Sequence, residues 1–163
     1  MTDTERQSLQ QACDSLITQH NSLLLASINR EGKADISYAP YFRGVSGFYI
    51  FVSELAKHTQ NLLYNSHASV LFIESEASAA NPFARLRLTL DCQVKEISKT
   101  TPEYSQILDA MAAKFGETVS VLRSLPDFHL LLLTPQSGQF VAGFGKAYPV
   151  DSTGQLLWSQ LRT

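Results

Sequence analysis

The residues best suited to bind an anion gather in one short segment, 53–61, which directly follows an apolar run, 48–52. They are Ser53, Lys57, His58, Thr59 and Asn61. An anion at the junction of a strand and a helix meets free backbone N–H groups, the positive end of the helix dipole and nearby hydroxyl or ammonium groups. Each hydrogen bond to a charged group contributes roughly 1.5–3 kcal/mol, so three or four can hold a phosphate. The segment is therefore a candidate anion site, and an ordinary solvated helix start is the alternative.

Two arginines, Arg85 and Arg87, stand two residues apart in a long alternating run, 83–97. Residues at this spacing share one face of a strand, so both guanidinium groups should point the same way. Guanidinium donors match phosphate or carboxylate oxygens in pairs. We expect both arginines to bind the anion, although edge charges that keep a strand soluble would have the same spacing.

An apolar bed for a planar ring system is offered by the aromatic run 38–42, YAPYF. We include Ser37, Tyr38 and Ala39 among the candidate cofactor-binding residues. Packing in the core is the alternative explanation for this aromatic run.

Phe144 and Lys146 stand in a glycine-rich run, Gly143-Phe144-Gly145-Lys146. The run has the spacing of neither a Walker loop nor a dinucleotide fingerprint. Its glycines favour a close turn of the chain, from which Lys146 can reach an anion. Both residues are therefore candidate cofactor-binding residues.

The four histidines, His20, His58, His67 and His129, show no metal-binding spacing. The chain contains neither H-E-x-x-H nor a histidine pair four residues apart, so we expect no zinc site made by protein ligands alone. Asp127 is the single tentative catalytic residue, since it could pair with a histidine. A turn residue before a strand is the alternative.

The composition favours a globular chain that binds its anion locally. With 13 Lys and Arg against 15 Asp and Glu, the net charge is −2, which argues against nucleic acid as a partner. The apolar runs are too short to span a membrane, and the polar start is unlike a signal peptide, so we expect a cytoplasmic protein. Cys13 and Cys92 form no metal motif and should be buried or half-buried free thiols.

Apolar periodicity divides the chain into short elements. Helices are expected at 4–18, 55–64, 101–115 and 117–123, and strands at 22–29, 34–42, 48–52, 69–73, 83–97, 127–134 and 139–144. Turns at 30–33 and 135–138 should make hairpins, 74–82 should be an exposed loop, and 143–148 should leave the sheet. We predict one domain, 1–163, with a helix within 1–18 and a tail from 149 to 163. Its fold class is mainly β: a six- to seven-stranded antiparallel barrel, closed or split, with peripheral helices.

Four strings resemble the FMN-binding split barrels related to pyridoxamine 5′-phosphate oxidase, and in particular the haem-utilisation proteins of the HugZ/HutZ type. They are LLLASINREGKADISYAPYF, FVSELAKHTQNLLYNSHASVLFIE, FARLRLTLDCQV and LPDFHLLLLTPQSGQFVAGFGKAY, and they span roughly residues 23 to 148. FARLRLTLD and GFGKAY are the more specific parts.

The resemblance implies a homodimer with its cofactor, FMN or haem, in a groove between the subunits. Ser53, Lys57, Thr59 and the arginines match residues that hold the flavin phosphate, and Asp127 matches an aspartate that supports a haem ligand. The C-terminal histidine that ligates haem in the family has no counterpart after His129 in this sequence. The expected function is thus to degrade or sequester haem, with an FMN-dependent oxidoreductase and a non-catalytic haem or flavin carrier as alternatives.

Overall fold

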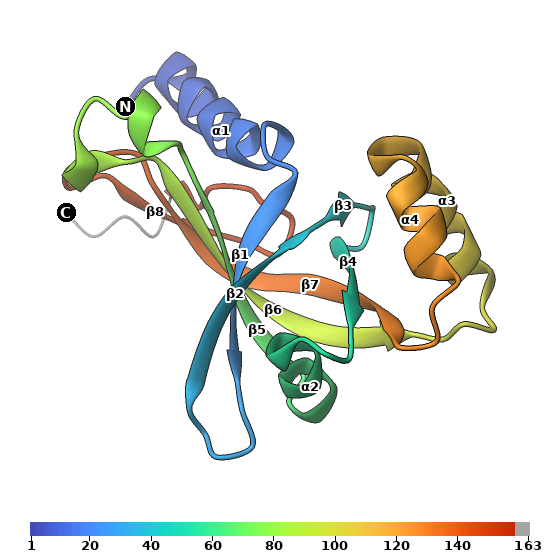
Figure 1. The fold of residues 1–163 in the computed structure, drawn as a ribbon. Coiled ribbons are helices and arrows are strands. Elements are labelled where there is room, and N and C mark those ends of the chain that lie inside the picture. The colour runs from blue at the N-terminus through green and yellow to red at the C-terminus, as the bar shows by residue number, and fades with distance from the viewer. Residues whose placement is uncertain (159–163) are drawn as a thin grey trace.

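The computed structural model describes residues 1–158 and shows a strongly curled sheet with helices around it (Figure 1). The helices are α1 (Asp3–Thr18), α2 (Lys57–Tyr64), α3 (Pro102–Phe115) and α4 (Glu117–Arg123). The strands are β1 (Ser22–Ile28), β2 (Ala34–Pro40), β3 (Phe42–Arg43), β4 (Phe48–Ser53), β5 (His67–Ile73), β6 (Arg87–Ile97), β7 (Phe128–Val141) and β8 (Ala147–Val150). Among these residues no helix is both long and apolar enough to span a bilayer.

All four predicted helices are present, and local contacts explain where two of them begin. The Thr2 hydroxyl accepts a hydrogen bond from the Glu5 backbone, and the Glu5 carboxylate accepts one from Thr2, which makes a capping box for α1. At α3 the Thr101 hydroxyl is the cap, and it accepts a hydrogen bond from the backbone N–H of Tyr104. Gly116, with φ of +85°, ends α3 in a backbone region that other residues rarely adopt. By contrast, α2 begins with no side-chain cap.

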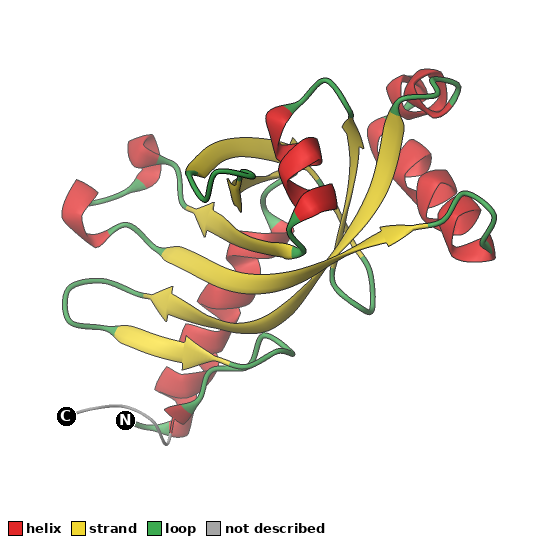
Figure 2. Ribbon diagram, turned by 90° about the horizontal axis from the view of Figure 1, so that it is seen from below, coloured by secondary structure: helices red, strands yellow, loops and turns green. Residues whose placement is uncertain are grey.

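The strands form one antiparallel sheet in the order β2-β1-β5-β6-β7-β4-β3, with β8 paired to β7. The edge strands β2 and β3 are separated in sequence by Tyr41 alone, so the segment 34–43 pairs with β1 at one end and with β4 at the other. This shared segment brings the two edges of the sheet together and curls it into a barrel (Figures 1 and 2). The antiparallel barrel with peripheral helices is confirmed, with eight strands described where six or seven were predicted.

Two apolar clusters hold these layers together. Inside the barrel, strand residues such as Leu25, Ile50 and Phe140 are fully buried, and α1 covers them with Cys13 and Leu16. A second cluster lies where α3 packs on the outside of β4 and β7, and it includes Tyr49, Tyr104, Leu108 and Leu130. In Figure 2, α1 lies across the sheet, whereas α3 and α4 lie together at one side.

Both cysteines are buried free thiols in the barrel cluster, as predicted. Burial raises the pKa of Cys13 and of Cys92 to about 12. A thiol with this pKa stays protonated near neutral pH and is a poor nucleophile, so both cysteines act as small apolar residues.

The predicted hairpin between 127 and 144 is wrong, because β7 runs without a turn from Phe128 to Val141 beside β6. Asp91 pairs with Ser137 and Cys92 pairs with Pro135, which leaves Gln136 unpaired in a β-bulge. A Cβ at position 138 would lie 2.4 Å from the Thr89 carbonyl oxygen, so glycine is needed there for close pairing. Proline and glycine therefore mark a bulge in this strand and not a turn.

The prediction that 143–148 leaves the sheet is also wrong, because the chain turns back and pairs with β7 as β8. The backbone N–H of Ala142 donates to the Lys146 carbonyl, and the N–H of Lys146 donates to the Gly143 carbonyl. Gly143 and Gly145 both have positive φ, which permits this tight turn. Of the predicted C-terminal tail, residues 149–150 belong to β8 and 159–163 lie outside the described residues.

The strand predicted from residue 83 begins only at Arg87, because 82–84 form a short 3₁₀ turn. Arg85 lies between this turn and the strand, and its guanidinium donates to the Glu74 carbonyl at 2.6 and 3.2 Å. Arg87 donates back to the Arg85 carbonyl. The two arginines are neighbours, but they do not share a strand face as predicted.

A charged brace connects three segments at the α2 end of the barrel. His129 of β7 donates from Nδ1 to Glu96 of β6 at 2.5 Å and from Nε2 to Glu54, just after β4, at 2.7 Å. An imidazole can donate from both nitrogens only when it is protonated. Partial burial lowers the pKa of His129, but the hydrogen bonds and charges of Glu96 and Glu54 outweigh it, so the pKa lies above its ordinary value.

This brace predicts a pH dependence of stability. Because the pKa of His129 is raised in the folded chain, its contribution is complete below about pH 6.5 and is lost as the pH rises through the raised value. We expect the stability advantage of the wild type over His129→Gln to shrink by about 1 kcal/mol between about pH 6 and pH 9, a small value because both carboxylates are half-exposed. Urea unfolding at each pH measures it. The exposed His67→Gln is the control, and an advantage that does not change with pH would contradict the brace.

Candidate functional site

The first turn of α2 leaves hydrogen-bond donors without acceptors. The helix follows Ala56, which has no side-chain cap, and within residues 1–158 the backbone N–H groups of Lys57 and His58 have no acceptor. The Thr59 hydroxyl is fully buried and is the single buried side-chain polar atom in this part of the chain with no partner. Such a group costs about 1–3 kcal/mol. The start of α2 therefore has the unsatisfied groups that an anion or a water would complete.

Ser53 and Asp127 meet and fix the turn that leads into α2. The Ser53 hydroxyl donates to Asp127 Oδ2 at 2.6 Å and accepts from the backbone N–H of Leu55 at 3.1 Å. The Glu54 N–H donates to the Asp127 carbonyl at 2.8 Å. Asp127 thus contacts Ser53 of the candidate anion site and not a histidine, while His129 pairs with the two glutamates of the brace.

His58 contacts the second strand through one nitrogen. Its Nδ1 lies 2.8 Å from the Ser37 hydroxyl, which brings together two predicted site residues that are 21 positions apart. Burial lowers the pKa of His58. The imidazole is therefore neutral near pH 7, so Lys57 is the charged side chain of this helix start.

Asn61 connects α2 to the rest of the chain. Its side chain is buried and donates to the Ser27 hydroxyl at 3.0 Å and to Asp35 Oδ2 at 2.9 Å. These bonds fasten α2 to the hairpin of β1 and β2, which lies beside it at the bottom of Figure 1. Ser27 and Asp35 were missed from the sequence because single polar residues in alternating strands give no sign of a helix that docks on them.

Three further predicted residues lie at the other end of the barrel. Arg87 pairs with Val141 at the end of β7, and Phe144 and Lys146 lie exposed in the turn that follows. Ser53, by contrast, pairs with Phe128 at the beginning of β7. These 14 residues measure roughly 40 Å along the strand at about 3.3 Å each. One chain alone therefore does not gather the α2 residues and these cations around one small ligand.

Residues on the second strand face two ways. Ser37 points toward α2, Ala39 is buried in the barrel core, and Tyr38 is 64% exposed on the outer face. The backbone register places Tyr38 beside Leu24, and Leu24 beside Leu71, on that same face. The outer face thus carries an apolar row with no cover in the described chain.

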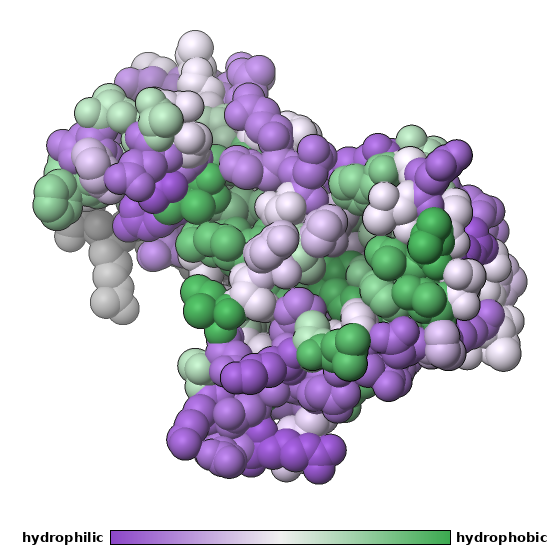
Figure 3. Space-filling view, in the orientation of Figure 1, coloured by the Kyte–Doolittle hydropathy of each residue, from purple (hydrophilic) through white to green (hydrophobic). Residues whose placement is uncertain are grey.

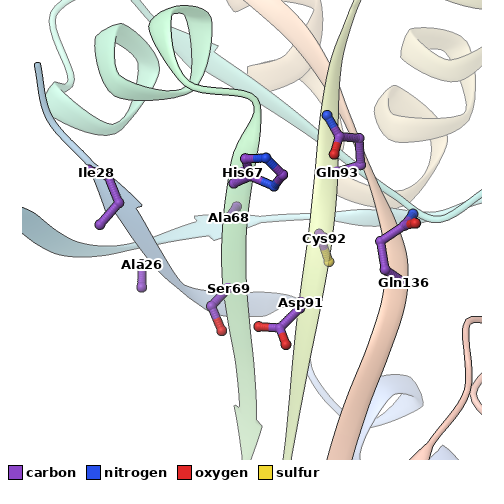
Figure 4. A pocket seen from close by; sticks show the side chains of 9 residues that line it. All are labelled: Ala26, Ile28, His67, Ala68, Ser69, Asp91, Cys92, Gln93 and Gln136. Carbon is purple, nitrogen blue, oxygen red and sulfur yellow. The ribbon is translucent and has the colours of Figure 1, made fainter. Parts of the chain in front are cut away.

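A surface cavity of about 550 Å³ lies on the outside of β1, β5 and β6 (Figure 4). Its polar side chains include His67, Asp91 and Gln93, and Ala26 and Ile28 form its apolar side. No predicted cofactor-binding residue lines it. This cavity is thus separate from the candidate anion site at the start of α2.

Comparison with known proteins, by sequence and by structure, finds relatives of the HutZ and ChuZ type. Haem oxygenase HutZ of Vibrio cholerae is 36% identical over 133 residues, which are 82% of this chain and 76% of that protein. A crystal structure of HutZ, described as the haem storage protein of the same species, has a TM-score of 0.73 at 33% identity and covers 88% of this chain and 96% of its own. ChuZ of Campylobacter jejuni has a TM-score of 0.81 at 30% identity, and the match spans 92% of this chain but 61% of ChuZ.

The family model described as pyridoxamine 5′-phosphate oxidase matches residues 9–142, which include the whole barrel as far as the end of β7. The match thus contains the α2 segment, the arginines and Asp127. From this match and the curled antiparallel sheet, the chain belongs to the pyridoxamine 5′-phosphate oxidase family of FMN-binding split barrels, among relatives that include HutZ and ChuZ.

Proposed function

We propose that this protein binds haem in a groove between two copies of the chain and degrades or sequesters it. The observation that carries the proposal is the division of the predicted site: an uncapped helix start lies at one end of β7, and the part-buried Arg87 and the exposed Lys146 lie at the other. A second copy can bring the cations of one chain to the α2 of its partner. The relationship to HutZ, which is described both as a haem oxygenase and as a haem storage protein, supports haem as the ligand and leaves both uses open.

The outer face of β1, β2 and β5 is the surface that we assign to the second copy. Ile36 is 81% exposed and Tyr38 is 64% exposed, although both lie in a strand of a well-packed sheet. Leu24 and Leu71 continue the row at neighbouring register positions. In Figure 3 apolar surface shows in several places above the hydrophilic hairpin tip. Exposed apolar rows of this kind are typical of interfaces.

The residues of the chain fit a planar dianionic ligand. Lys57 and the free N–H groups of α2 can bind one carboxylate or phosphate, while Arg87 or Lys146 of the partner copy binds another. Exposed apolar side chains such as Tyr38 and Phe144 can cover a ring and keep water from it. Bound haem would supply the iron chemistry with oxygen, and the protein would position the ring and its charges.

FMN is the alternative ligand, and the uncapped start of α2 is what favours it. A flavin phosphate would receive the N–H groups of Lys57 and His58 and the ammonium group of Lys57. The protein would then be a flavin oxidoreductase, and a non-catalytic carrier of either cofactor would show binding without turnover. The cytoplasmic location expected from the sequence is part of the same proposal.

Absorption spectroscopy of the purified chain distinguishes haem from FMN as the ligand. Titration with haemin should give a Soret band shifted from that of free haemin, whereas FMN binding would retain a band at about 450 nm through gel filtration. Lys57→Ala should weaken binding roughly tenfold to a hundredfold, because it removes one charge-assisted contact. Lys95→Ala, which changes an exposed lysine of β6, should have no effect. A chain that binds neither compound at micromolar levels would refute the proposal.

The proposed interface can be tested with a substitution that should prevent two copies of the chain from associating. Leu24→Lys places a charge in the middle of the apolar outer row and should convert a dimer into a monomer with weakened haemin binding. Val121→Lys, on the exposed side of α4, is the matched control and should leave the dimer intact. Sedimentation velocity measures both. A wild-type chain that sediments as a monomer would remove the shared groove from the proposal.

A further inference from the structure

We propose that His58 ligates the haem iron through Nε2, with Ser37 holding the imidazole in place. This inference rests on the proposed haem function and assigns the axial ligand within the same site. The warrant is the hydrogen bond of 2.8 Å between His58 Nδ1 and the Ser37 hydroxyl, together with the place of His58 in the first turn of α2.

The four histidines differ in their surroundings, and these differences decide which of them can ligate iron. His129 uses both ring nitrogens on carboxylates and has no lone pair left to offer. His67 is exposed, and within residues 1–158 its ring has no hydrogen bond that would orient it. His20 donates from Nδ1 to the Leu16 carbonyl, but it lies after α1, away from the anion-binding segment. His58 alone combines an oriented ring with that segment.

The bond to Ser37 can take the form that metal-binding histidines share. When Nδ1–H donates to an oxygen, Nε2 carries the lone pair, and the partner fixes both the tautomer and the direction of the ring. The hydroxyl of Ser37 can accept this hydrogen. In the described chain, Nε2 of His58 has no partner. Partial burial also lowers the pKa of the ring, which keeps it neutral as a ligand must be.

The position of His58 agrees with the other contacts that haem needs. The porphyrin supplies four nitrogen donors, so the protein has to supply one ligand and not a cluster. Lys57 precedes His58 directly, and its exposed ammonium group can reach a propionate at the edge of the ring. The hydrogen bonds of Asn61 to Ser27 and Asp35 hold α2 against the same hairpin that carries Ser37. The ring of His58, the charge of Lys57 and the contacts of Asn61 therefore all belong to α2 and the hairpin to which it is bonded.

The test adds haemin to the full chain and follows ligation by resonance Raman and electron paramagnetic resonance. His58→Ala should lose the iron–histidine signal, and added imidazole should restore it. His20→Ala is the matched control, because it removes a ring that is also held through Nδ1, and it should keep the signal. Ser37→Ala should retain a histidine ligand but bind haemin about tenfold more weakly. Circular dichroism checks that each variant is folded.

The outcomes distinguish this inference from the function on which it rests. If the wild type binds haemin and His58→Ala shows the same iron–histidine signal, the ligand is another group and the inference alone is overturned. Loss of the signal in His20→Ala with retention in His58→Ala would overturn it equally. If the wild type binds no haemin, both the proposed haem function and the assigned ligand are refuted.

Discussion

The pairing of β7 along its whole length is the constraint on which the architecture depends. It joins β6, β4 and β8, and its bulge at Gln136 lets one strand follow the strong curl of the sheet. Ser53, just before α2, pairs with the beginning of β7, and Arg87 lies beside its end, so the strand also sets the distance between two groups: the start of α2 and Arg87. A small ligand that needs both groups must lie between two chains. The separation of the two groups within one chain is therefore a consequence of the fold.

Periodicity alone predicted most of the elements, because apolar alternation and helical spacing reflect which side of each element is buried. It failed where proline and glycine allow two structures. The run Pro135–Gly138 has the composition of a turn, but close pairing with β6 makes it a bulge. The run 143–146 was correctly expected to turn, yet the strand after it was missed. Both errors concern pairing partners, which are distant in sequence and leave no local pattern.

The candidate site was predictable in its residue types but not in how they are used. Three polar residues of the α2 segment show the difference: Ser53 fixes a turn with Asp127, Asn61 docks the helix, and Thr59 is buried without a partner. A sequence shows that hydroxyl and amide groups are close together, whereas burial and direction depend on strands that arrive later in the chain. The partners Ser27 and Asp35 are ordinary strand residues by any local signal.

His58 was named from the sequence as one residue of the candidate anion site, whereas the structure shows a ring that burial keeps neutral. A ring that burial keeps neutral adds no charge to an anion site, so Lys57 and the backbone N–H groups would bind the phosphate or propionate. His129, which the sequence did not mark as charged, is the histidine whose pKa is raised. The two histidines differ because carboxylates surround one and a hydroxyl and burial surround the other. A neutral, oriented imidazole next to an anion site contributes little to a flavin phosphate and suits a metal, which is the physical argument for haem over FMN.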